Sequence, residues 1–202
     1  MRRHGIKKSW WLWLVLALTL WQTVGTAQQL GRRAAGVGMR FSQPLEAAQL
    51  EAARTAAAEN GLSVSFWGEQ PGQARTEAGR SAEAVGVFCD SQPDRCWPAV
   101  YSAGTAPGTA DQNACAVSEG LAQALWGSTQ AVGNTLYWQQ DTYTVCGVFR
   151  GDETRLVYLG QGDFTALELT GISPDNPVET ASQYRSGAGL PQPSAMVAGP
   201  IL

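Results

Sequence analysis

Beyond its first eight residues, the chain contains neither a histidine nor a lysine. The only histidine is His4, and the only lysines are Lys7 and Lys8. The rest of the chain therefore cannot build a Ser-His or Cys-His catalytic pair, an imidazole metal site, a Schiff-base nucleophile or a lysine-containing phosphate loop. These absences exclude the commonest hydrolytic machinery and nucleotide chemistry. We expect no catalytic residue, no cofactor and no metal.

Basic residues are scarce after the N-terminus. The formal net charge of the chain is −3, yet Arg2, Arg3, Lys7 and Lys8 all lie at its start. The remaining chain is acidic and carries no polybasic stripe that could neutralise phosphates, so we expect no nucleic-acid binding. Two carboxylates far apart in the sequence could still form a hydrolase pair, but solvated surface acids are the simpler interpretation.

Charge is absent from one long apolar run, Trp10 to Thr26, which follows the basic start. Its most apolar part, Trp10 to Trp21, has the length of a signal-peptide core, and Gly25-Thr26-Ala27 resembles a cleavage site. Tryptophans near both ends and the uncharged stretch Gln22 to Thr26 favour an uncleaved transmembrane helix instead. We expect a single-pass protein of the cell membrane, with its basic start and transmembrane helix at 1–27. The N-terminus is then cytoplasmic and the main domain extracytoplasmic.

Four cysteines, Cys89, Cys96, Cys115 and Cys146, lie beyond this run, where an oxidising compartment permits disulfides. Two bridges can form in three ways. Cys89 and Cys96 flank a Pro-Asp turn, whereas Cys115 and Cys146 each lie in an apolar strand-like run. We expect disulfides rather than a zinc site because no close C-x-x-C pair is present, and buried free thiols are the alternative.

The pattern of apolar residues predicts an α+β domain at 37–189, after a juxtamembrane linker at 28–36. Its first half predicts a strand at 37–41, a helix at 44–60, strands at 62–67 and 84–88, and a loop-rich stretch at 91–113. Its second half predicts a strand at 114–117, a helix capped by Ser118, a hairpin at 136–148, strands at 155–159 and 164–169, and a last helix starting at Asn176. We expect a compact mixed sheet with about three helices and no clear inserted second lobe, followed by an irregular tail at 190–202.

Four tryptophans in the domain suggest either core packing or ligand stacking. Trp126 and Trp138 lie on the apolar faces of predicted elements, which favours core packing. Trp97 stands beside Pro98 in the loop-rich stretch, and it is the candidate ligand contact.

Three neighbouring segments carry a resemblance to a known family. They are Cys115 to Gly127 (CAVSEGLAQALWG), Val132 to Leu136 (VGNTL) and Tyr143 to Phe149 (YTVCGVF). Together they resemble the MacB-like periplasmic core domain of ABC transporter permeases in the FtsX/MacB superfamily. The positions that match the family's pattern are structural ones: Ser118, Leu125, Trp126, Gly127, Gly133, Val145, Gly147 and Val148.

The resemblance implies an extracytoplasmic domain that couples a cytoplasmic ABC ATPase, together with permease transmembrane subunits, to events outside the membrane. Family permeases continue into about three more transmembrane helices, whereas this sequence stops at Leu202. The chain is therefore either a truncated permease or a separate relative that needs a membrane partner. The alternative function is a single-pass or secreted ligand-binding module with no transport role.

Overall fold

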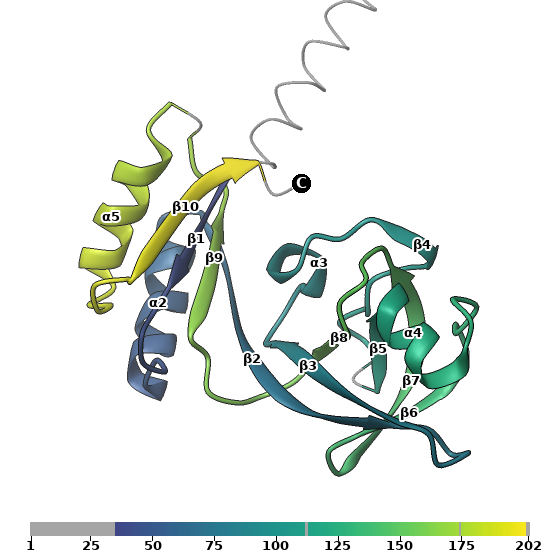
Figure 1. The fold of residues 1–202 in the computed structure, drawn as a ribbon. Coiled ribbons are helices and arrows are strands. Elements are labelled where there is room, and N and C mark those ends of the chain that lie inside the picture. Colours follow the sequence, from purple (N-terminus) through teal and green to yellow (C-terminus); the bar gives the residue numbers. More distant parts are fainter. Residues whose placement is uncertain (1–34, 112, 174, 201–202) are drawn as a thin grey trace, which may run out of the picture.

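The computed structural model describes residues 35–111, 113–173 and 175–200. Within these ranges one mixed sheet of ten strands runs through the molecule (Figure 1). Its main path has the order β10-β1-β9-β2-β3-β8-β5-β7-β4, and β6 pairs with β2 and β7. The elements are β1 (Ala35–Arg40), α2 (Ala47–Glu59), β2 (Ser63–Arg75), β3 (Ser81–Cys89), α3 (Pro93–Cys96), β4 (Tyr101–Gly104), β5 (Ala114–Ser118), α4 (Glu119–Trp126), β6 (Thr135–Trp138), β7 (Asp141–Phe149), β8 (Arg155–Leu159), β9 (Ala166–Thr170), α5 (Pro177–Gly187) and β10 (Ala195–Pro200).

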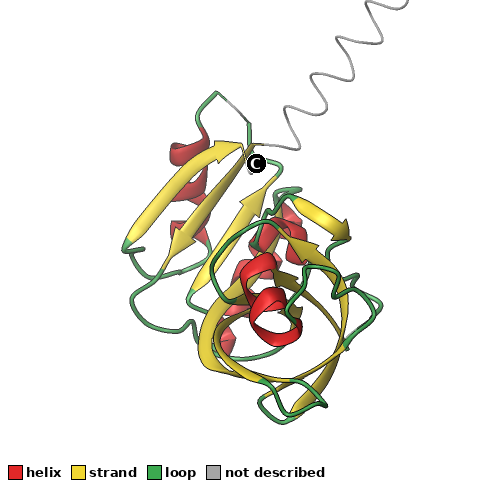
Figure 2. Cartoon of the chain, turned by 45° about the vertical axis from the view of Figure 1, so that its right-hand side comes forward, coloured by secondary structure: helices red, strands yellow, loops and turns green. Residues whose placement is uncertain are grey.

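Six strands of this sheet close into a barrel. β2 pairs with β3, β3 with β8, β8 with β5, β5 with β7, and β7 with β6. β6 then pairs back with β2, through Ala74 opposite Trp138 and Arg75 opposite Tyr137. Figure 2 looks along this ring, with α4 in front of its opening. Closure satisfies the backbone groups that an open edge would expose.

Trp138 fills the interior of the barrel. Its side chain is 1% exposed, and its indole nitrogen donates to the Tyr158 hydroxyl at 3.2 Å. A Cβ atom at Gly72 or at Gly86 would lie only 2.9 or 2.7 Å from the Trp138 ring. The two glycines on β2 and β3 therefore make the room that this ring occupies, because no larger residue fits there.

The remaining strands form an open sheet with helices on one face, which we call the helical lobe. β10, β1 and β9 continue the sheet from the first half of β2, and α2 and α5 pack on the same side of it (Figure 1). Small residues on the helices allow this close packing, and the Tyr184 hydroxyl of α5 donates to the Ala53 carbonyl of α2 at 2.8 Å. The buried side chains at this contact include Val37, Met39, Ala53, Ala57, Phe66, Leu167, Leu169 and Ala181.

The second lobe is the barrel together with α4, and both predicted ends of α4 are confirmed. Ser118 caps the helix, because its hydroxyl accepts from the Leu121 amide at 3.1 Å. Gly127 ends it in the left-handed conformation, with φ of 69°. The Ser118 hydroxyl also accepts from the Arg155 amide at 3.0 Å and donates to the Glu153 carbonyl, which ties α4 to the start of β8.

Three expectations from the sequence differ from the structure. The stretch at 91–113 contains α3 and β4, because its apolar residues cover the outer face of the barrel. The tail at 190–202 is not irregular throughout, since β10 pairs with β1 in antiparallel register from Ala195 to Pro200. The domain has two lobes rather than one, since β2 extends to Arg75 and so reaches from the helical lobe into the barrel.

The boundaries of the predicted linker and last helix also change. The linker at 28–36 overlaps β1, which begins at Ala35. The last helix begins at Pro177 as its sequence suggests, but the Asn176 side chain makes no capping hydrogen bond. No helix in the described part of the chain is long and apolar enough to cross a bilayer. The expected transmembrane helix at 1–27 lies outside the described residues.

Replacing Ser118 by alanine should destabilise the domain by about 2 kcal/mol, because it removes the cap of α4 and leaves buried backbone groups without partners. Urea unfolding followed by circular dichroism measures this loss. Ser128→Ala is the matched control, because the Ser128 hydroxyl accepts a single hydrogen bond, from the Gln130 amide, in an exposed turn. Equal unfolding midpoints for the two variants would contradict the role given to Ser118.

Candidate functional site

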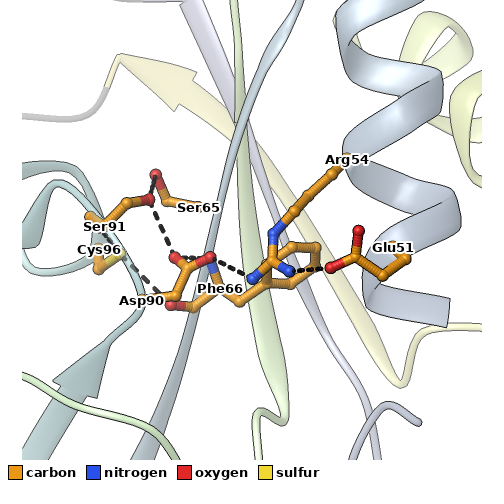
Figure 3. A network of polar contacts seen from close by, with 7 residues as sticks. All are labelled: Glu51, Arg54, Ser65, Phe66, Asp90, Ser91 and Cys96. Atoms are coloured by element: carbon orange, nitrogen blue, oxygen red, sulfur yellow. Dashed lines mark hydrogen bonds and ion pairs between the residues drawn. The ribbon is translucent and has the colours of Figure 1, made fainter. Parts of the chain in front are cut away.

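The two lobes meet where β3 leaves its ladder with β2, and a network of polar side chains occupies this junction (Figure 3). The last paired residues of the ladder are Trp67 and Cys89. One residue further, the Asp90 amide still donates to the Phe66 carbonyl at 3.0 Å. The Phe66 amide donates to the Asp90 carboxylate instead of a backbone carbonyl, at 2.8 Å. The carboxylate therefore replaces the acceptor that the ladder loses as β3 turns away.

Asp90 also reaches across to the helical lobe. Nη2 of Arg54, on α2, lies 3.0 Å from the second carboxylate oxygen of Asp90, whose side chain is only 7% exposed. Nη1 of Arg54 pairs with Glu51 at 2.6 Å, and Glu51 is 73% exposed. The guanidinium lies over the Phe66 ring, 5.4 Å from its centroid. A single arginine thus connects α2 to the point where the barrel begins.

A second tie joins the lobes through α3, which packs on the side of the sheet opposite α2 and α5. Arg95 donates from Nη1 to the Ser63 hydroxyl at 3.0 Å and to the Thr170 hydroxyl at 2.9 Å. These two residues lie on β2 and β9, where they pair with each other in register. Arg95 therefore fastens the segment after β3 to the sheet of the helical lobe.

A buried carboxylate lies on the same face of the sheet. Glu168 of β9 accepts from Arg40 Nη1 at 3.0 Å and from the Trp67 indole nitrogen at 3.2 Å. A Cβ atom at Gly38 would lie 2.8 Å from both of its oxygens, so this glycine makes space for the carboxylate. Burial raises the pKa of Glu168, and it outweighs the lowering by Arg40.

Trp97, the candidate ligand contact, lies in a stack of aromatic rings and arginines. Arg40 lies 4.0 Å above the Trp67 ring, and Trp67 meets Trp97 edge-on with centroids 6.4 Å apart. Arg155 covers Trp97 at 4.8 Å and pairs with Glu69 at 2.7 Å. Ligand contact at Trp97 stays a prediction, and the observed contacts of this ring are with Trp67 and Arg155.

The expected disulfides are not formed, and all four cysteines are free. Cys115 lies opposite Val145, and the register then shifts, so Cys146 is the unpaired residue of a β-bulge. Its sulfur lies 3.2 Å from the Cys115 carbonyl oxygen. Cys96 directs its sulfur to the carbonyls of Ser91 and Phe66, at 3.6 and 3.9 Å. The Cys89 thiol and burial both raise the pKa of Cys96, which keeps it in the thiol form.

The positions that matched the family pattern have structural places in the barrel lobe. Gly133 has φ of 90°, and its amide donates to the Val145 carbonyl at 2.8 Å, which sets the start of the β6–β7 hairpin. A Cβ atom at Gly147 would lie 2.2 Å from the Thr105 carbonyl oxygen, so close backbone approach requires glycine. The Leu125, Val145 and Val148 side chains are buried, and Trp126 is partly buried.

Neither a metal site nor the junction residues were predicted from the sequence. Among the described residues, no three histidine, cysteine, aspartate or glutamate side chains form a group that could hold a metal ion. Arg54 and Asp90 were not predicted from the sequence as site residues. The one signal for Asp90 is its position directly after the apolar run that ends at Cys89, and Arg54 gives no signal within a helix rich in alanine and glutamate.

Asp90→Ala should destabilise the domain by about 3 kcal/mol, because it leaves the Phe66 amide and the Arg54 guanidinium without their shared partner. Glu51→Ala removes the other partner of Arg54 and should cost less than about 0.5 kcal/mol, because Glu51 is exposed. Urea unfolding of both variants tests this difference. Asp90→Asn keeps an acceptor for the Phe66 amide, so its loss in the free energy of unfolding should lie between those of the other two variants. Similar losses of unfolding free energy for Asp90→Ala and Glu51→Ala would contradict the role of Asp90 as the shared partner of Phe66 and Arg54.

Glu168 should make the domain less stable as the pH rises. The folded state holds the Glu168 proton more tightly than the unfolded chain does. The contribution of this proton to the free energy of unfolding is therefore complete below pH 4.5, the ordinary pKa of glutamate. That contribution is lost as the pH rises through the raised folded-state pKa. The free energy of unfolding of the native chain, relative to Glu168→Gln, should therefore fall as the pH rises above 4.5 and through the raised folded-state pKa. Glu69→Gln, at an exposed ion pair, is the control, and a flat difference for Glu168→Gln would disprove the assignment.

By sequence, the chain matches no protein-family model and no curated protein. By structure, it is similar to the extracellular domain of the ABC-type transporter YknZ from Gram-positive bacteria. That superposition has a TM-score of 0.60 at 16% identity, and it covers 80% of this chain and 98% of the YknZ domain. The chain is also similar to the periplasmic region of MacB from Actinobacillus actinomycetemcomitans, with a TM-score of 0.62 at 14% identity, over 84% of this chain and 90% of that region. This chain therefore has the fold of the MacB-like periplasmic core domain of ABC transporter permeases.

Proposed function

We propose that this chain is the extracytoplasmic domain of an ABC-type transporter permease, and that it transmits conformational change mechanically without catalysing a reaction. One observation carries the proposal: the described chain matches nearly the full length of two such domains in structure. The residues that match the family pattern fit this function, because they shape and pack the barrel lobe and none of them supplies a reactive group.

The position of the chain ends supports a membrane-proximal helical lobe. Ala35 and Pro200 pair in register on β1 and β10, so the described chain enters and leaves the domain at one place. A domain fixed to a membrane through this place would present its barrel on the far side (Figure 1). We propose that the apolar run at 10–26 is the anchor, with a cytoplasmic N-terminus.

The junction supports a mechanical function because it joins the lobes by more than one route. β2 is continuous between them, Arg54 binds Asp90 from one face, and Arg95 binds Ser63 and Thr170 from the other. A displacement of the helical lobe would therefore move the barrel with it. We propose that a cytoplasmic ABC ATPase and permease transmembrane subunits drive such a displacement, for export or for mechanical signalling.

Purification of the native protein from its own membranes in mild detergent tests this function. We expect mass spectrometry to identify an ABC ATPase and permease transmembrane subunits in the same complex. Membranes that lack this chain provide the background for nonspecific recovery. Recovery of the chain alone, or of a chain that begins after Ala27, would overturn the proposal and favour a secreted or single-pass binding module.

A further inference from the structure

A pocket of about 720 Å³ opens at the mouth of the barrel. Three segments form its wall: the turn between β2 and β3, the last turn of α4, and the segment that leads into β6. This volume lies within the range of small-molecule sites, and barrel mouths are common places for them. The lining residues are Thr76, Glu77, Ala78, Arg80, Leu125, Trp126, Gly133, Asn134 and Thr135.

Trp126 supplies an aromatic wall in this pocket. It is the last residue of α4, and Gly127 then ends the helix in the left-handed conformation. Trp126 is only partly buried, with one side against the barrel core, whereas the neighbouring Leu125 is 1% exposed and fixes the helix. The sequence favoured core packing for Trp126. The structure shows both core packing and a place in the pocket wall.

A second wall is a preorganised turn that carries two unlike charges. The Thr76 amide donates to the Arg80 carbonyl at 2.9 Å, and the Thr76 hydroxyl accepts from the Arg80 amide at 3.2 Å. Gly79, with φ of 80°, completes the turn. Among the described residues, neither Glu77 nor the Arg80 guanidinium belongs to an ion pair. Both side chains are therefore available to bind a ligand at this rim.

The combination of these groups suits a neutral polyhydroxylated ligand. Arg80 donates hydrogen bonds and Glu77 accepts them, while Asn134 and Thr135 do both. A sugar hydroxyl also donates and accepts, so it can use both kinds of partner at once. The opposite charges of Arg80 and Glu77 favour neither an anion nor a cation. The face of an indole ring packs against the apolar C–H face of a sugar ring.

An extended peptide fits this place less well. Peptides that add to a sheet need a strand with an unpaired edge. Beside the pocket, Ala74 of β2 already pairs with Ala82 of β3 on one side and with Trp138 of β6 on the other. β2 therefore offers no free backbone edge beside the pocket, which favours recognition by side chains.

We propose that this pocket binds a short neutral saccharide, with one sugar ring on Trp126 and its hydroxyls hydrogen-bonded by Arg80, Glu77 and Asn134. The site does not depend on a permease function, because its lining residues all belong to the barrel and α4. A failure to bind saccharides would therefore not contradict the permease proposal. A failure to find permease partners would not contradict saccharide binding.

Titration of the full chain with three probes tests the site: maltotriose, cellotriose and triacetylchitotriose. The chain is purified in a zwitterionic detergent whose headgroup contains no sugar. We expect saturable binding of at least one probe, seen as saturation transfer to sugar ring protons and as a change in tryptophan fluorescence. Trp126→Ala should weaken it by about tenfold, and Trp126→Phe should weaken it less, because a smaller ring remains. Arg80→Ala should weaken it severalfold without a change in the unfolding midpoint.

Tyr137→Ala is the matched control, since Tyr137 is a 38% exposed aromatic residue on β6 that does not line the pocket. Its affinity for the probes should be unchanged. The proposal is overturned if none of the three probes binds, or if only trialanine binds in a parallel titration. It is also overturned if Arg80→Ala, Trp126→Phe and Tyr137→Ala all bind like the native chain.

Discussion

The Asp90 carboxylate occupies the point on which the arrangement of the two lobes depends. β2 must pair with β9 in the helical lobe and with β3 in the barrel, and at Asp90 the β3 chain leaves this ladder. If β3 turned away from β2 without a replacement acceptor, the Phe66 amide would be left without a hydrogen bond, at a cost of about 1–3 kcal/mol. Asp90 supplies that acceptor with one oxygen and binds Arg54 with the other. The same side chain therefore permits the sheet to divide and holds the two parts together.

Rigidity on either side of this junction comes from packing rather than from covalent bridges. In the barrel, Trp138 fills the space left by Gly72 and Gly86, and its indole nitrogen binds Tyr158. In the helical lobe, alanines on α2 and α5 allow the helices to approach the sheet closely. The four cysteines are free, so no disulfide supports either lobe. Motion can therefore pass between the lobes through the continuous β2 and the polar contacts of Arg54 and Arg95. It can also pass through the chain between β8 and β9, where Phe164 packs against Phe66 and Phe88.

The sequence predicted those parts of the fold that local physics determines. The Ser118 cap, the Gly127 stop and the strand at 155–159 follow from side-chain chemistry within a few residues, and all are confirmed. β10 was not predicted, because its only regular feature is its pairing with β1, about 160 residues earlier in the chain. For Cys115 and Cys146, the disulfide prediction failed for a similar reason. A bulge of one residue at Cys146 changes the direction of its sulfur, and spacing alone does not reveal a bulge.

The candidate sites follow the same division between local and long-range information. Trp97 and Trp126 were judged by their neighbours in the sequence, as a loop residue and a core residue. The fold adds contacts that the sequence did not indicate, since Trp67 and Arg155 pack against the partly buried Trp97. The end of α4 brings the partly buried Trp126 to the barrel mouth. The mouth exists only because β6 returns to β2, a contact between distant segments. A pocket residue in a closed barrel therefore becomes recognisable only once the closure itself is known.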